Sequence, residues 1–112
     1  MFKWNGEEIS EEVVPKVVAE VFGCSAHRVA YSDEDNLVMN CKELEEELLE
    51  MQQAVIDISE GEDWIEIDGM SVDREFAIDY VIERGWQIAD ELEDEKLFSA
   101  IYLFEDYHIK ED

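Results

Sequence analysis

The sequence predicts an α+β domain with three or four helices packed on a small antiparallel sheet made from β-hairpins. Long stretches repeat apolar residues at steps of three and four, which is the spacing of one helix face. Short apolar segments lie between them, and two of these adjoin an Asn-Gly or Asp-Gly pair, which favours a hairpin turn. The length of 112 residues and the aromatic content of 11% fit one domain, residues 1–112.

The N-terminal segment predicts a strand and a helix. Phe2–Trp4, before Asn5-Gly6, is expected to form either a short strand with a tight turn or an ordered N-terminal arm. Ser10 fits the N-cap of the helix, and Gly23 fits the position just after its last turn. Pro15, however, suits only a first turn, so the regular helix is alternatively expected to begin nearer Glu12–Val14. The helix follows from a four-residue apolar repeat of Ile9, Val13, Val17 and Val21.

A hairpin and a second helix are expected next. Arg28–Ser32 and Leu37–Cys41 are rich in strand-forming residues, and the acidic segment 33–36 between them predicts the hairpin tip. Lys42–Ile58 is expected to be a helix with carboxylates on the side away from its apolar face. That face carries Leu44, Leu48, Met51, Val55 and Ile58.

The C-terminal half predicts a second hairpin and one or two further helices. Trp64–Ile67 and Met70–Val72 flank Asp68-Gly69, a strong turn signal. Asp73 is the expected N-cap of the next helix, which Gly85 either ends or weakens.

The apolar segment Leu97–Phe104 fits either a buried helix or a central strand. Asp94-Glu95 before it favours the helix, because acidic residues stabilise a first helical turn. The charged tail Glu105–Asp112 is expected to be partly frayed.

The net charge is the unusual property of this chain. Its 32 acidic and 8 basic residues give a formal net charge of −24, whereas a small domain usually carries a net charge of about 2–8 in magnitude. Such self-repulsion destabilises the compact state. Direct binding to nucleic acid is disfavoured, because it requires Lys and Arg to neutralise phosphates.

The acidic residues form rows with a four-residue step on the predicted helices, such as Glu43 and Glu47. Like charges at this spacing destabilise a helix, so the rows favour a function that uses their field. We therefore expect the partner-binding residues to be Asp33, Glu34, Asp35, Glu43, Glu46, Glu47, Glu50, Glu75, Asp79, Glu83, Asp90, Glu91 and Asp94. Aromatic anchors at Tyr31, Trp64, Trp86 or Tyr102 would add affinity, although each also fits a core position.

The residues show no reaction centre, and we expect no enzyme activity. His27 lies near Cys24 and admits a Cys–His pair, but a loop histidine beside a small buried thiol is the more common arrangement. The sequence has no Gly-rich phosphate loop. Acidic loops starting at Asp33 and Asp57 lack the glycine that the sixth position of an EF-hand requires, so no metal site and no cofactor are expected.

The two cysteines, Cys24 and Cys41, have no paired spacing and are expected to be reduced thiols in a cytoplasmic protein. The N-terminus lacks the apolar region of a signal peptide. No apolar run reaches the length of about 18 residues that a transmembrane helix needs, so no membrane partner is expected.

In length, net charge and acidic helical rows, the chain resembles the small acidic DNA-mimic proteins of phages and mobile elements, which include anti-restriction and anti-CRISPR proteins. The resemblance implies a non-enzymatic inhibitor that blocks the nucleic-acid groove of a basic target in the host cytoplasm. A homodimer would double the length of the charged surface.

Other classes share these features. An immunity protein or antitoxin that neutralises a nuclease toxin is the first alternative. A halophile-type acidic protein, whose charge serves hydration in strong salt, is the second. A small-molecule binder is the third, and it would show a closed apolar cavity with convergent polar groups.

Overall fold

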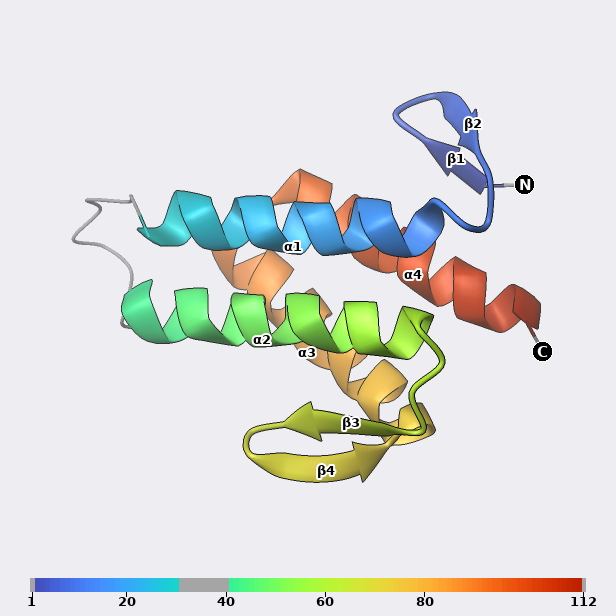
Figure 1. Ribbon diagram of the computed structural model, residues 1–112. Helices are drawn as coiled ribbons and strands as arrows, with labels where there is room; N and C mark the ends of the chain where they lie inside the picture. The colour runs from blue at the N-terminus through green and yellow to red at the C-terminus, as the bar shows by residue number, and fades with distance from the viewer. Residues whose placement is uncertain (1, 31–40, 112) are drawn as a thin grey trace.

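Four helices and two separate hairpins form the part of the chain that the structure describes. The computed structural model describes residues 2–30 and 41–111. In chain order the elements are β1 (Phe2–Trp4), β2 (Glu7–Ile9), α1 (Val14–Ala30), α2 (Cys41–Ser59), β3 (Trp64–Ile67), β4 (Met70–Asp73), α3 (Arg74–Leu92) and α4 (Glu95–Glu111) (Figure 1). The α+β class is confirmed, although the hairpins form two two-stranded sheets and not one.

Both hairpins turn on two residues with positive φ. Asn5 and Gly6 have φ of 52° and 84°, and Asp68 and Gly69 have 55° and 76°. Positive φ at both central residues matches the right-handed twist of paired strands, so the predicted turns are confirmed and the N-terminal segment is a hairpin. The antiparallel registers end at the pairs Phe2–Ile9, Trp4–Glu7, Trp64–Asp73 and Ile67–Met70.

The predicted end of α1 at Gly23 is wrong, because the helix continues to Ala30. Gly23 allows α2 to approach α1 closely, because a Cβ at this position would lie 2.5 Å from the Gln52 amide nitrogen. That nitrogen donates a 2.9 Å hydrogen bond to the carbonyl of Ala19. Glycine is therefore tolerated within the helix because it makes room for a helix–helix hydrogen bond.

The predicted strand Arg28–Ser32 is also wrong for residues 28–30, which are helical. The reason is that buried Ala26 and Val29 continue the apolar face of α1 past the glycine. At the other end α1 begins at Val14, which confirms the alternative start near Glu12–Val14 that Pro15 favoured, and Ser10 is not its N-cap. Residues 31–40 of the predicted hairpin lie outside the described residues, and Cys41 already belongs to α2.

In α3 the predicted N-cap is confirmed, since an oxygen of Asp73 accepts a 2.8 Å hydrogen bond from the Phe76 backbone N–H. Gly85 does not end the helix. It is buried, and a Cβ there would lie 2.8 Å from Cδ1 of Ile101. Gly85 therefore sets how closely α4 approaches α3.

The helical alternative for Leu97–Phe104 is confirmed, and α4 extends to Glu111. The charged tail is helical from Glu105 to Glu111. Tyr107 is half-buried, and its ring lies 5.9 Å from the ring of Phe2 in β1. Packing of the N-terminal hairpin on this end of α4 explains why the helix continues.

The helices form two layers. Figure 1 shows α1 and α2 side by side and antiparallel, with α3 and α4 crossing behind them and β3–β4 beside α2. The extents of 42 × 36 × 17 Å describe a flat molecule. The core lies between the layers and includes Val18, Phe22, Leu48, Ile88 and Ile101. Within residues 2–30 and 41–111, no helix is long and apolar enough to cross a membrane.

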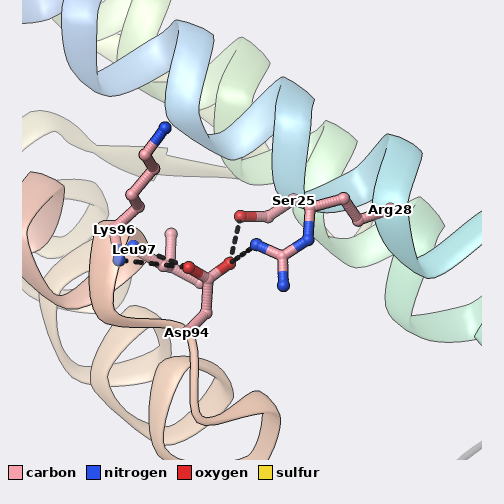
Figure 2. Close-up of polar contacts among 5 residues, drawn as sticks. All are labelled: Ser25, Arg28, Asp94, Lys96 and Leu97. Atoms are coloured by element: carbon pink, nitrogen blue, oxygen red, sulfur yellow. Dashed lines mark hydrogen bonds and ion pairs between the residues drawn. The ribbon is translucent and has the colours of Figure 1, made fainter.

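Asp94 joins the two layers at the turn between α3 and α4 (Figure 2). Its side chain caps α4 by accepting hydrogen bonds of 3.1 and 3.2 Å from the backbone N–H groups of Lys96 and Leu97. Its other oxygen accepts a 2.8 Å hydrogen bond from the Ser25 hydroxyl and one of 3.1 Å from Arg28, both on α1. Asp94 is only 4% exposed, so it does not belong to the exposed acidic surface that we expected it to join.

We predict that Asp94→Ala lowers the free energy of unfolding by about 2–4 kcal/mol, measured by urea denaturation. The loss combines about 1 kcal/mol for a helix cap with about 1–3 kcal/mol for leaving the buried Ser25 hydroxyl without its acceptor. Asp94→Asn should lose less, because Asn also caps helices well.

Arg28→Ala is the companion variant. The Arg28 side chain is 65% exposed, so its ion pair should contribute less than about 1 kcal/mol. A loss for Asp94→Ala no larger than that for Arg28→Ala would show that Asp94 does not join the layers.

Candidate acidic interface

One side of α2 turns its carboxylates toward the β3–β4 turn and α3, where they line an open hollow of about 290 Å³. The apolar face of α2, from Leu44 to Ile58, is buried against the core, which fixes the rotation of the helix. We call this feature the acidic hollow. It is lined by Glu43, Glu46, Glu47 and Glu50 of α2, Asp68 of the hairpin turn and Tyr80 of α3.

Arg84 connects α3 to α2 at the hollow by binding Glu47. Its Nε and Nη2 bind the two carboxylate oxygens of Glu47, and the Nη2–Oε2 distance is 2.9 Å. The hydrogen bond that Arg84 donates to the Glu47 carboxylate raises the pKa of Arg84 above its usual value. A two-pronged pair of this kind fixes both side chains, so one of the four α2 carboxylates that line the hollow is neutralised within the chain.

The β3–β4 turn is fastened to the same side of α2. The backbone N–H of Asp68 donates a 3.2 Å hydrogen bond to a carboxylate oxygen of Glu50. This contact brings the Asp68 carboxylate to the hollow, although 18 residues separate it from Glu50 in the chain. The type I′ geometry of the Asp-Gly turn therefore has a second role, which is to present an additional acid beside α2.

Tyr80 reports how closely these carboxylates converge. Its pKa is raised above the usual value near 10, first by burial of the phenol and then by the charges of Glu47, Asp68 and Glu50, while Arg84 lowers it. A nearby negative charge disfavours the phenolate. Carboxylates from α2 and from the hairpin thus act on one phenol of α3.

The acidic row of α3 does not join the hollow as one continuous face. Tyr80 and Arg84, one turn apart, face α2. Glu75 and Asp79 line a different hollow on the α4 side of α3. The row continues at the exposed positions Glu83, Asp90 and Glu91, and of these Glu91 is close enough to raise the pKa of Arg84.

Three of the candidate residues, Asp33, Glu34 and Asp35, lie outside the described residues. Asp68, Tyr80 and Arg84 line or border the hollow but are not among the partner-binding residues expected from the sequence. A sequence signal for the last two exists, because Tyr80 and Arg84 are four residues apart and therefore lie on the same side of a helix.

The structure also describes residues that bear on metal binding, a Cys–His pair and a small-molecule cavity. Among residues 2–30 and 41–111, no three His, Cys, Asp or Glu side chains are grouped so that they could hold a metal ion. Cys24 and His27 are both exposed on α1, so the expected loop histidine and buried thiol are wrong. The hollows at α2 and at α3–α4 are open and lined with charged residues, unlike the cavity expected for a small-molecule binder.

We predict that Glu50→Gln combined with Asp68→Asn lowers the pKa of Tyr80, measured by ultraviolet difference absorbance with Tyr80→Phe used to assign the transition. Removing two negative charges makes the phenolate easier to form. In the native protein the raised pKa favours the folded state most below pH 10, and this contribution is lost as the pH rises through the folded-state pKa.

Glu60→Gln with Glu62→Gln is the matched control, since it removes the same charge at exposed positions that do not act on Tyr80. An equal shift in both double variants would mean that the general charge of the chain, and not convergence at the hollow, raises this pKa.

Comparison of the chain with protein-family models, with curated proteins and with solved structures finds no match.

Proposed function

We propose that this protein is a non-enzymatic inhibitor that occupies the phosphate-binding groove of a basic protein that handles nucleic acid. The observation that carries the proposal is the convergence of Glu43, Glu46, Glu50 and Asp68 on one open hollow, in a chain of net charge −24. Carboxylates brought together from two elements create a local field that neither element has alone.

The charge density of this surface is about half that of duplex DNA. Glu43 and Glu50 are about 10 Å apart along the helix axis. With Glu47 neutralised by Arg84, the remaining α2 carboxylates and Asp68 present about one charge per 3 Å, whereas duplex DNA presents about one per 1.7 Å. A groove that binds phosphates would therefore attract this side of the protein.

A basic partner also relieves a cost that the isolated chain bears. Carboxylates held near one another repel, and the field of the whole protein adds to that repulsion. Lys and Arg side chains of a partner would replace it with attraction and speed association toward about 10⁸ M⁻¹s⁻¹ at low salt. Charge of this kind acts mainly on the association rate.

Two kinds of target have such a groove. The resemblance to phage-encoded DNA mimics favours an effector of a host defence system, such as a restriction or CRISPR nuclease. A nuclease toxin, for which the protein would act as an immunity protein or antitoxin, is the alternative. Both use basic residues to hold phosphates, so the same test applies to both.

The test is capture of partners from host lysate at low salt, followed by elution with duplex DNA. We predict that the captured protein is basic, that DNA releases it, and that Glu43→Lys/Glu46→Lys/Glu50→Lys slows its association at least tenfold, because the local field is reversed. Surface plasmon resonance measures the rate.

The matched control is Glu7→Lys/Glu8→Lys/Glu11→Lys, which changes the net charge equally at exposed positions near the N-terminus. It should associate much faster than the α2 variant. Equal slowing in both variants, or a captured protein that DNA does not displace, would contradict the proposed function.

A further inference from the structure

A second surface lies on the other side of α3. An open groove of about 630 Å³ runs between α3 and α4, and we call it the α3–α4 groove. Its apolar residues are Ile78, Ile82 and Ile109, and Ile109 is 64% exposed. Its charged and polar lining consists of Arg74, Glu75, Asp79, Glu105 and His108.

An aromatic cluster continues the apolar surface along the same two helices. The ring of Trp86 lies 5.4 Å from that of Phe98 and 4.5 Å from that of Tyr102, which is 65% exposed. Ile78, Ile82 and Trp86 follow one another at steps of four along α3. Only two residues connect α3 and α4, so the end of α3 lies beside the start of α4. The aromatic cluster is at this end of the helix pair and the groove is farther from the connection, so together they form one stripe.

The stripe combines apolar side chains with an acidic rim. Exposed apolar surface rimmed by polar residues marks an interaction site more often than chance exposure. The stripe spans about 12 Å along α3, which corresponds to two turns of a docked helix. Apolar side chains at i, i+3 or i+4 and i+7 of such a helix would fill it.

We propose that the α3–α4 groove binds a cationic amphipathic helix of a partner protein. Leucine-like side chains would pack on Ile78, Ile82 and Ile109, and Lys or Arg on the edges of that helix would pair with Glu75, Asp79 and Glu105. The acidic rim supplies the charge complementarity, and the isoleucines supply apolar area. The proposal does not depend on the acidic hollow, because the two surfaces lie on different sides of α3.

A second copy of this chain is a poor occupant. A two-fold contact would bring the same patch of both subunits together, so Glu75, Asp79 and Glu105 would meet their own copies. Each subunit also carries a net charge of −24. This repulsion opposes self-association through the groove.

The probe is a synthetic Leu/Lys peptide of about four helical turns with its leucines on one face. A scrambled peptide of equal composition, with leucines around the whole helix, has the same charge. By fluorescence anisotropy at physiological salt, we expect the patterned peptide to bind at least tenfold more tightly than the scrambled one. If binding came only from general attraction to an acidic protein, the two peptides would bind with equal affinity.

Ile109→Ala should weaken binding of the patterned peptide several-fold and leave the scrambled peptide unchanged. Leu49→Ala is the matched control, because Leu49 is an exposed apolar residue of α2 that does not line the groove. Circular dichroism establishes that both variants keep the helices, which is expected for exposed positions.

Equal affinity for the two peptides, or equal effects of Ile109→Ala and Leu49→Ala, would overturn the proposal. Self-association that Ile109→Ala abolishes in sedimentation experiments would also overturn it and identify a second copy as the occupant. The α2 charge-reversal variant separates this proposal from the proposed function, because it should keep the ratio between the two peptide affinities while losing its target.

Discussion

The buried carboxylate of Asp94 is the interaction on which the arrangement of the helices depends. Burying a charge is costly unless hydrogen bonds compensate for it, and here Ser25, Arg28 and two backbone N–H groups of α4 do so. The contact fixes the α3–α4 turn against α1. The buried apolar side of α3, which includes Val81 and Ile88, then determines which side of that helix faces α2 and which side faces the groove.

The few basic residues of the chain are used in a consistent way. All three arginines connect separate elements: Arg28 binds Asp94, Arg74 donates to the carbonyl of Ile58 at the end of α2, and Arg84 binds Glu47. The lysines at positions 3, 16, 42 and 96 are exposed. Arginine suits such bridges because its planar group donates several hydrogen bonds in fixed directions. The arginines thus connect elements of the fold, whereas most carboxylates remain on the surface without an arginine partner from the described residues.

Local patterns were sufficient to predict most elements, and tertiary contacts account for the failures. The turns at Asn5-Gly6 and Asp68-Gly69 and the cap at Asp73 follow from residues adjacent in the chain. The predicted helix end at Gly23 was wrong, because the residue that requires a glycine there, Gln52, lies on another helix. The acidic residues of α2 were predictable from periodicity, but their convergence with Asp68 depends on how the second hairpin packs. Burial of Asp94 likewise needs Ser25, 69 residues away.

The two surfaces would contribute differently to one complex. The acidic hollow offers charge, which mainly governs encounter, whereas the α3–α4 groove offers apolar side chains that can be desolvated, as strong anchors are. Of the aromatic candidates, Tyr102 and Trp64 are each 65% exposed, and Tyr102 adjoins the groove. The exposed carboxylates of Glu83 and Asp90 lie on the part of α3 that faces solvent, between its α2 and α4 sides. A basic partner bound at the hollow would therefore meet the further exposed carboxylates of Glu83 and Asp90 before it reached the groove.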